Sequence, residues 1–321
     1  MSASVIISNF NGLRFLPKLL ETLRNQSKGA PEIIIVDRHS TDGSKEFLAK
    51  QADVKVVEHP PEAGLVSGYA VGCSLATQDH LYFSNEDMWL DENCLESLEA
   101  ALNPEQRVAV ADPWQWTYDG RHWIHGVTRF RSTKWSWNSP YPFRKAEYCS
   151  QEGATLEIPY PCAGAFMIHR AAFDEAGGWD TRFFLDHEDV DLGLRLWKSG
   201  WKSVSVPKAK VYHAVGASNA QVLEQGKQRV SEKRYISGRA NLMMVQFKHL
   251  STPMIPAIGL WWALELVKNV AKRDVSLVRG ALKAGRFTLD HLPALVEDRR
   301  RLRGRRPGLA PFFTNSTFNE N

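Results

Sequence analysis

Glu32-Ile33-Ile34-Ile35-Val36-Asp37 is a continuous apolar run that ends in a carboxylate. A strand that is apolar at successive positions is typical of a parallel sheet covered by helices on both faces. Strands and helices are predicted to alternate along the first hundred residues, at 4–8, 16–23, 32–37, 44–50, 54–57, 66–76 and 80–84. This alternation predicts the α/β class, with a mostly parallel central sheet and a ligand site beyond the carboxyl ends of its strands.

Length and composition indicate an ordinary globular protein. The 321 residues are 43% hydrophobic, carry a net charge of +4 and include four cysteines without Cys-x-x-Cys spacing. Neither a zinc site nor a disulfide framework is therefore expected. The first residues lack the basic region and long apolar stretch that are typical of a signal peptide, and no run of about 18 or more apolar residues is present. We expect a cytoplasmic protein without a transmembrane helix.

Acidic residues crowd the start of a later predicted helix. Asp186, Glu188, Asp189 and Asp191 follow an aromatic pair and precede an apolar helical face, with Gly200 as the predicted helix stop. Backbone N–H groups at a helix N-terminus favour negative charge, so a carboxylate here is a candidate general base. The alternative is that Asp186 caps the helix while its neighbours are solvated.

The segment 112–161 is rich in tryptophan and tyrosine and has weak periodicity, which predicts a loop-rich insertion. Such a composition argues against disorder. It is consistent either with a small aromatic core or with a surface on which sugar rings stack. Beyond it, helices are predicted from about residue 221 to 303. The predicted organisation is a catalytic domain at 1–218 and a helical region at 219–321.

Polar residues follow four predicted strands and are expected to share one cleft. They are the segments Ser8-Asn9-Phe10-Asn11-Gly12, Asp37 to Ser44, Asn85-Glu86-Asp87, and His213. Asp37 suits the edge of a nucleobase, whereas Asp87 with His213 suits a divalent metal. No glycine-rich phosphate loop is present, so a metal is expected to handle the phosphates of a nucleotide.

Several motifs in sequence order resemble one family. They are Val5-Ile6-Ile7-Ser8-Asn9, Ile34-Ile35-Val36-Asp37 with Ser40-Thr41-Asp42-Gly43-Ser44, Ala63-Gly64-Leu65, Asn85-Glu86-Asp87, Cys162-Ala163-Gly164-Ala165, Gly177-Gly178-Trp179-Asp180 and Glu188-Asp189. Over about residues 3–250 the chain resembles the family 2 glycosyltransferases, which have the GT-A fold, use nucleotide sugars and invert at the anomeric carbon. His213 and the group Tyr235, Arg239 and Asn241 resemble the rhamnosyltransferase and galactofuranosyltransferase members.

The resemblance implies a role for each matched residue. Asp189, or alternatively Glu188, is the expected base, and Asp87 with His213 holds Mg²⁺ or Mn²⁺. The nucleotide-binding set is Ser8, Asn9, Asn11, Asp37, Ser40, Gly64, Asn85 and Glu86. The acceptor-binding set is Trp114, Trp116, Gly164, Ala165, Trp179 and Asp180. One departure is Asn85, which stands where the family has the first acid of Asp-x-Asp and is a weaker metal ligand than a carboxylate.

The implied partners are a UDP- or dTDP-sugar donor and a glycan or lipid-linked acceptor of the cell envelope. An apolar stretch beside basic residues favours an anionic membrane surface, and the alternative is a helical packing domain with a solvated basic face. The residues are Trp261, Trp262, Leu264, Leu266, Val267, Lys268, Lys272, Arg273, Arg299, Arg300 and Arg301. The protein is then peripheral on the inner face of the membrane. Self-association stays open, and no nucleic-acid motif is present. The competing functions are a sugar nucleotidyltransferase and a non-catalytic carbohydrate-binding protein on a degenerate transferase fold.

Overall fold

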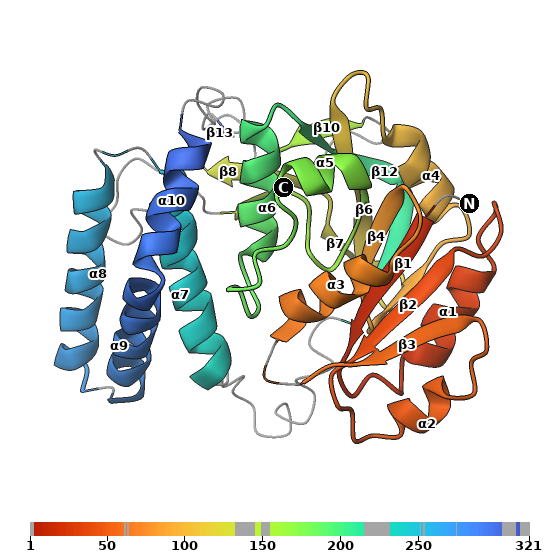
Figure 1. Ribbon diagram of the computed structural model, residues 1–321, viewed down its shortest axis with the longest axis horizontal. Helices are drawn as coiled ribbons and strands as arrows, with labels where there is room; N and C mark the ends of the chain where they lie inside the picture. Colours follow the sequence, from red (N-terminus) through yellow and green to blue (C-terminus); the bar gives the residue numbers. More distant parts are fainter. Residues whose placement is uncertain are drawn as a thin grey trace.

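The computed structural model describes residues 3–60, 62, 64–131, 145–148, 155–214, 232–250, 252, 254–273, 275–303 and 313–314. Within them a ten-stranded sheet lies between helices, and further helices stand beside it as a bundle (Figure 1). The strands of this sheet are β1 (Ala3–Asn9), β2 (Glu32–Asp37), β3 (Val54–Glu58), β4 (His80–Asn85), β5 (Met88–Leu90), β6 (Val108–Thr117), β7 (Trp123–His125), β10 (Leu156–Ile158), β11 (Ala165–His169) and β12 (Lys202–His213). The helices that cover it are α1 (Leu16–Arg24), α2 (Ser44–Leu48), α3 (Gly64–Leu75), α4 (Cys94–Ala101), α5 (Arg170–Glu175) and α6 (Glu188–Lys198).

The sheet is mixed. In the order β10-β12-β6-β11-β4-β1-β2-β3, the part from β4 to β3 is parallel, as the apolar strands predict. Strand β11 runs antiparallel to both of its neighbours, and β12 runs parallel to β6. The carboxyl ends of β1, β2, β4 and β12 therefore lie along one edge, where the predicted polar residues follow them.

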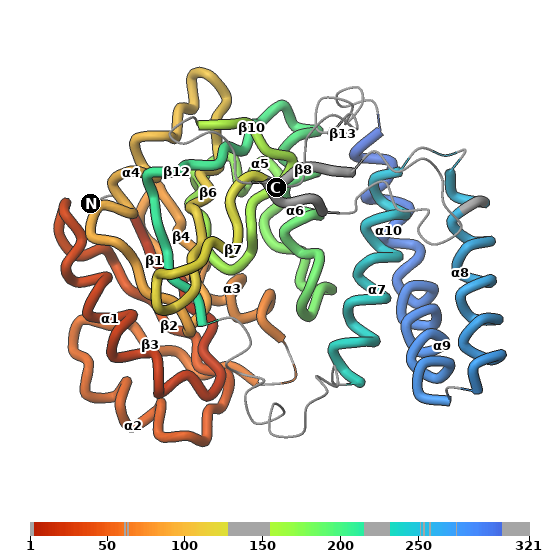
Figure 2. The backbone as a smooth tube through the Cα atoms, turned by 180° about the vertical axis from the view of Figure 1, so that it is seen from behind, coloured from red at the N-terminus to blue at the C-terminus, as the bar shows by residue number. Residues whose placement is uncertain are grey.

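Alternate residues of β1 face two separate hydrophobic clusters, which places a core on each side of the sheet. Ile6 packs in the cluster that contains residues of α3 and α6. Val5 and Ile7 pack in the other cluster, with residues of α1 and α4. The reverse view shows the two helical layers on opposite faces of the sheet (Figure 2). A strand buried on both faces explains why its sequence is apolar at every position.

The segment 112–161 is more regular than its sequence predicts. Strand β6 enters it, and the small sheet of β8 (Val127–Arg131), β9 (Lys145–Tyr148) and β13 (Phe313–Thr314) uses part of it. Trp114 is 5% exposed and packs edge-to-face on Trp123, so an aromatic core explains these two rings. Tyr160 is also buried, whereas Trp135, Trp137 and Tyr141 lie outside the described residues.

The helical bundle consists of α7 (Glu232–His249), α8 (Met254–Ala271), α9 (Val275–Asp290) and α10 (Leu292–Leu302). Met244 and Val245 of α7 belong to the same core cluster as α6, so the bundle and the sheet share a hydrophobic core. The predicted domain boundary at residue 218 lies outside the described residues. No helix in the described part of the chain has the length and apolar character needed to cross a membrane.

Candidate active site

The ends of β1 and β2 are joined through the Asp37 carboxylate. Asp37 is 1% exposed and accepts hydrogen bonds from the Asn9 amide at 2.7 Å and from the Ser40 hydroxyl and N–H at 2.7 and 2.8 Å. Asn11 completes the turn, because its N–H donates to the Ser40 hydroxyl and its side-chain oxygen accepts from the N–H of Thr41. The structure thus brings together four residues that the sequence predicts as nucleotide-binding.

Ser8 and Asn9 leave hydrogen-bonding capacity unused at this edge. The Ser8 hydroxyl and the Asn9 side-chain oxygen are buried without a hydrogen-bond partner among the described residues. Gly68 of α3 allows this packing, since a Cβ there would lie 2.4 Å from the Ser8 oxygen. Buried polar atoms of this kind usually have a partner, so they favour a polar ligand here.

Gly64 starts α3 and fixes the neighbouring acidic loop. Its φ of +85° lies in the left-handed region, and a Cβ would lie 2.5 Å from the Phe184 ring. The following N–H, of Leu65, donates to the Phe184 carbonyl at 3.0 Å. Gly64 therefore joins the predicted nucleotide side to the loop that leads into α6.

Asp87 and His213 lie together because β5 pairs with the end of β12, where Met88 is opposite His213. The His213 Nε2 lies 3.1 Å from an Asp87 carboxylate oxygen. The other ring nitrogen, Nδ1, lies 3.3 Å from the Gln115 side-chain oxygen. If Nδ1 carries the proton and donates it to Gln115, Nε2 is left without a proton and can bind a metal. In many metal sites a hydrogen-bond partner orients a histidine ligand in this way. Gln115 was missed by the sequence analysis, which had no signal for its partner on β12.

This donor set fits a hard divalent cation. A carboxylate oxygen and an imidazole nitrogen converge, and both side chains are largely buried. No group of three or more His, Cys, Asp or Glu residues suited to a metal occurs in the described part of the chain. A cation held by Asp87 and His213 would need further ligands from water or from a bound diphosphate.

Glu86 and Asn85 stand between this pair and the nucleotide side. Burial, together with the charge of Asp87, raises the pKa of Glu86 to about 7. The Asn85 side-chain oxygen accepts from the Tyr69 hydroxyl at 3.1 Å, and the Asn85 N–H donates to the Gly164 carbonyl at 2.9 Å. Asn85 thus uses its side-chain oxygen on a tyrosine hydroxyl.

Asp189 lies at the start of α6 and is held toward the same region. One of its oxygens accepts from the N–H of Ala163 at 3.2 Å, and the other accepts from the N–H of Val190 at 2.7 Å. Ala163 precedes Gly164, which bonds to Asn85, and the Tyr69 hydroxyl lies 3.5 Å from the Ala163 carbonyl. The predicted base is therefore connected to the predicted nucleotide and metal side through one short loop.

Glu188 is in a different environment from Asp189. It is 4% exposed, and one carboxylate oxygen has no hydrogen-bond partner among the described residues. Burial and the neighbouring Asp189 charge raise the pKa of Glu188 well above its usual range. A protonated, enclosed carboxyl is a poor acceptor of a substrate proton near neutral pH, so the geometry favours Asp189 of the two predicted bases.

The turn before α6 is held by α7 rather than by a cap. Asp186 and His187 have φ values of +73° and +69°. The Asp186 carboxylate pairs with Arg234 at 3.1 Å, and the Asn241 amide donates to the Leu185 and Asp186 carbonyls at 2.8 and 2.7 Å. The hypothesis that Asp186 caps the helix and its neighbours are solvated is wrong. Asn241, which the sequence analysis left without a role, fixes this turn.

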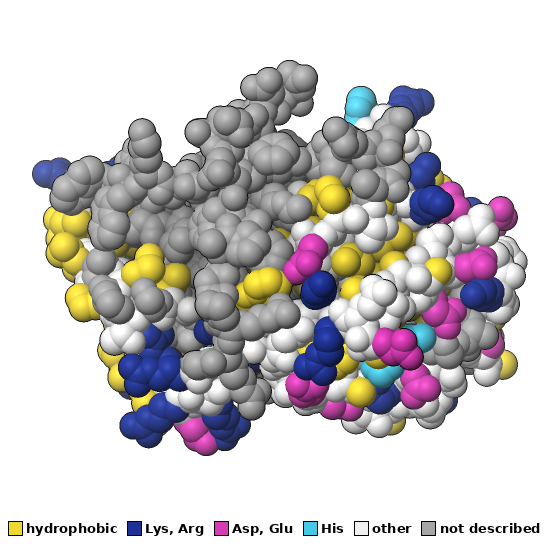
Figure 3. All heavy atoms as spheres, turned by 90° about the horizontal axis from the view of Figure 1, so that it is seen from above, with side chains coloured by type: hydrophobic (Ala, Val, Ile, Leu, Met, Phe, Trp, Pro, Cys, Tyr) yellow, Lys and Arg dark blue, Asp and Glu magenta, His cyan; other side chains and the backbone are white. Residues whose placement is uncertain are grey.

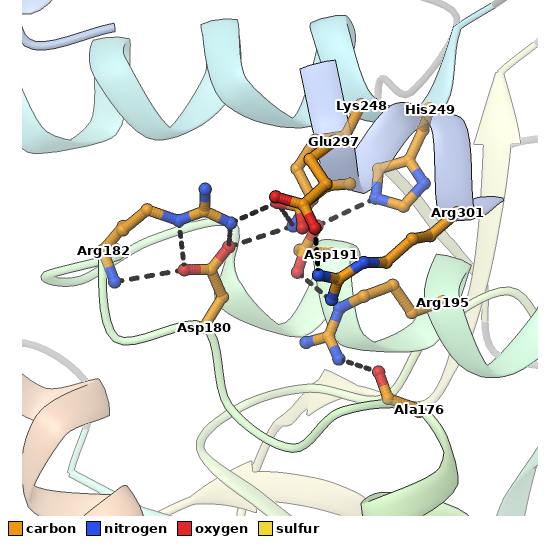
Figure 4. Close-up of polar contacts among 10 residues, drawn as sticks. Ala176, Asp180, Arg182, Asp191, Arg195, Lys248, His249, Glu297 and Arg301 are labelled. Carbon is orange, nitrogen blue, oxygen red and sulfur yellow. Dashed lines mark hydrogen bonds and ion pairs between the residues drawn. The ribbon is translucent and has the colours of Figure 1, made fainter. Parts of the chain in front are cut away.

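A buried ion network lies behind α6. Asp191 bonds to Lys248 at 2.6 Å, to Arg195 at 2.8 Å and to His249 at 2.8 Å (Figure 4). Burial works against ionisation of Asp191, but Lys248 and Arg195 hold its pKa well below its usual range. Asp180, predicted to bind the acceptor, belongs to this network, since it pairs with Arg182 and lies 3.0 Å from Lys248.

The other residues that are predicted to bind the acceptor differ in how deeply they are buried. Trp179 is 7% exposed and stacks on Tyr69 in the core, and the buried Trp114 N–H bonds to Ser205. Enclosed rings offer no face to a sugar, so the burial of Trp114 and Trp179 does not favour their assignment to the acceptor-binding set. Trp116 is partly exposed, and Gly164 and Ala165 follow the Ala163 N–H that holds Asp189. These three residues stay predictions.

The sheet is mixed, polar residues lie at its carboxyl edge, and an acidic helix start lies beside them. This combination is that of a nucleotide-sugar transferase of the GT-A fold. The model described as "Glycosyl transferase family 2" matches residues 4–177, and the chain belongs to this family. It is therefore a glycosyltransferase.

Two relatives show how far the likeness extends. N-acetylglucosaminyl-diphospho-decaprenol L-rhamnosyltransferase of Mycobacterium tuberculosis is 27% identical over 306 residues, which cover 84% of this chain and 91% of the relative. Polypeptide N-acetylgalactosaminyltransferase 8 of Drosophila melanogaster is 27% identical over 251 residues, which cover 74% of this chain but only 42% of the relative. The solved structure of GalNAc-T7 with UDP, GalNAc and Mn²⁺ superposes with a TM-score of 0.61 at 19% identity, covering 77% of this chain and 48% of that one. The last likeness concerns the fold alone.

Proposed function

We propose that this protein is a metal-dependent, inverting glycosyltransferase that moves a sugar from a UDP- or dTDP-sugar to a lipid-linked or glycan acceptor of the cell envelope. The observation that carries the proposal is the Ala163–Gly164 loop. Through main-chain bonds it holds the Asp189 carboxylate on one side and Asn85, two residues from Asp87, on the other. One loop thus holds both the proposed base and the edge proposed to bind the diphosphate. This arrangement is suited to a displacement at a sugar carbon that lies between them.

In the proposed reaction, Asp189 accepts the proton of an acceptor hydroxyl. The resulting oxygen nucleophile attacks the anomeric carbon from the face opposite the diphosphate. A new C–O bond forms as the bond from the anomeric carbon to the diphosphate oxygen breaks, and the nucleoside diphosphate leaves with that electron pair. The configuration at the sugar carbon inverts.

The donor half of the site uses the other strand ends. Asp37 accepts from the nucleobase or its ribose, while Asp87 and His213 would hold the divalent cation. When bound, this cation offsets the negative charge that builds on the departing diphosphate. Asn9 and Ser40 orient the Asp37 carboxylate through their hydrogen bonds.

A lipid-linked acceptor is favoured by the rhamnosyltransferase relative, which matches nearly the full length of both chains. Its name describes an acceptor that carries a decaprenol diphosphate. We extend to this protein only the general class of acceptor, a sugar on a polyprenyl diphosphate or a related glycan.

Calorimetric titration of UDP and dTDP, each with Mn²⁺, with Mg²⁺ or with EDTA, tests the donor half directly. We expect one nucleotide to bind, with at least about tenfold weaker binding in EDTA or in Asp87→Ala. Asp53→Ala, which removes an exposed carboxylate paired with Arg24, serves as the matched control and is expected to bind normally. No binding of either nucleotide would favour the non-catalytic alternative.

A further inference from the structure

The outward face of α8 is apolar. Leu260, Leu264 and Val267 are 61%, 41% and 63% exposed, and their spacing places them on one stripe of the helix. Val270 extends the stripe toward the C-terminal end of α8. A helix on the surface of a globular protein normally presents polar residues outward.

Three polar groups of α8 instead point into the bundle. Glu265 pairs with Arg239 of α7 at 3.3 Å, and the Trp262 indole N–H donates to the Gln246 side-chain oxygen at 3.0 Å. Asn269 is 3% exposed. The exposed side of α8 is therefore largely apolar, whereas polar groups on its other side bond to α7.

The neighbouring helix continues this face with a mixture of apolar and basic residues. Val275, Leu282 and Leu289 of α9 are exposed at intervals of seven residues. Basic side chains lie between and beside them, namely Lys268, Lys272, Arg273, Arg279, Lys283 and Arg286. Hydrophobic side chains line the edge of the molecule that α8 forms, with Lys and Arg side chains nearby (Figure 3). We call the exposed apolar residues of α8 and α9, together with these six basic residues, the α8–α9 face.

We propose that the α8–α9 face binds the surface of a bilayer that contains anionic phospholipid. Exposed apolar side chains with a basic border suit the interface between acyl chains and negatively charged headgroups. A second copy of the chain on the same face would set like charges against each other, which disfavours that occupant. The inference depends on this surface alone and not on the proposed transfer reaction.

The α8–α9 face keeps Leu264 and Val267 of the patch that the sequence predicts, but it does not include Trp262 or Arg299. Trp262 bonds inward to Gln246, and Arg299 donates to the main-chain carbonyls of Phe247 and Leu250. Arg299 is therefore a structural residue of the bundle and not part of a free basic face. The lipid-facing residues are the exposed apolar residues of α8 from Leu260 onward, together with the other residues of the α8–α9 face.

Co-sedimentation of the full chain with vesicles tests the proposal. One set contains phosphatidylcholine and phosphatidylglycerol in equal parts, and the other contains phosphatidylcholine alone. We expect at least about tenfold tighter binding to the anionic vesicles, weakened by salt. The variant L260S/L264S/V267S should bind about tenfold or more weakly, because it removes exposed apolar area and no core contact.

Two further variants make the test decisive. K272S/R273S/R279S should weaken binding to the anionic vesicles about tenfold while its melting curve stays unchanged. V56S/L75S changes exposed apolar residues elsewhere on the molecule and should bind as wild type. Absence of vesicle binding, or equal binding by L260S/L264S/V267S, would overturn the proposal. So would a dimer in analytical ultracentrifugation that this variant dissociates while no form binds vesicles.

Discussion

The Asn241 side-chain amide donates to the Asp186 main-chain carbonyl over 2.7 Å, across a sequence separation of 55 residues. This bond ties α7 to the turn that starts α6, and Asp189 lies in the first turn of α6. Two successive residues of that turn have positive φ, a conformation that costs free energy and persists only where the surroundings hold it. The helical bundle therefore positions the proposed base without contacting it.

Asn241→Ala should lower kcat for sugar transfer about 10- to 100-fold while nucleotide affinity changes by less than about twofold. The reason is that the turn loses two hydrogen bonds and Asp189 shifts, whereas the nucleotide side is untouched. Steady-state kinetics and calorimetry measure the two effects. Gln246→Ala is the matched control, since it removes another buried amide of α7 whose bond goes to Trp262 of α8. Equal losses of kcat in both variants would mean that general destabilisation, not positioning, is responsible.

The two adjacent carboxyl groups should behave differently when each is made an amide. Asp189→Asn should lower transfer about 100- to 10,000-fold, as loss of a general base does, and leave donor binding intact. Glu188→Gln should retain most activity, because burial and the Asp189 charge favour the neutral form of Glu188, which an amide resembles. Initial rates of nucleoside diphosphate release with acceptor present separate the variants. The reverse order of activity would assign the base to Glu188.

Lys248 should be important for stability because it is a buried cation between Asp180 and Asp191. Lys248→Met leaves these acids with one fewer positive partner, and we expect a loss of about 3–5 kcal/mol in the free energy of unfolding. Urea denaturation followed by circular dichroism measures it. Lys283→Met is the control, since its pair with Glu232 is exposed and its loss is expected to leave the stability nearly unchanged. Similar costs for the two variants would contradict a structural role for the buried network.

Glu32 should make the protein sensitive to acid. Burial favours its neutral form, but hydrogen bonds from Lys55, Ser4 and Thr77 outweigh this and lower its pKa to about 2. The folded-state pKa lies below the unfolded value of 4.5, so the stabilisation is present above pH 4.5 and is lost as the pH falls toward 2. We expect Glu32→Gln to be less stable than wild type by about 2 kcal/mol at pH 7 and to approach it at pH 2–3. Glu21→Gln, at an exposed position, provides the comparison, and a constant difference across pH would refute the assignment.

The strands and the order of the site residues were predictable because they depend on local sequence. Residues 32–37 form a strand buried on both faces, and the polar residues that follow such strands meet at one edge through the topology alone. Gly200, predicted as a helix stop, has a φ of +89° directly after α6. These features follow from periodicity and backbone preference.

The roles that could not be predicted from the sequence depend on long-range packing. The bond between His213 and Gln115 depends on the register of β12 against β6, and the role of Asn241 depends on where α7 packs. Trp179 and Asp180 were assigned to the acceptor from the motif that contains them, but they are held in the core and in the ion network. Aromatic and charged residues have the same local signature whether they bind a ligand or stabilise the fold.

The most direct test of the central claim is nucleoside diphosphate release from a panel of UDP- and dTDP-sugars. Each donor is assayed with Mg²⁺, Mn²⁺ or EDTA and with a synthetic polyprenyl-diphosphate sugar, for wild type and Asp189→Asn. We predict release from one donor that requires metal, increases with acceptor and is lost in Asp189→Asn. Release from no donor, or release that persists in Asp189→Asn, would contradict the account.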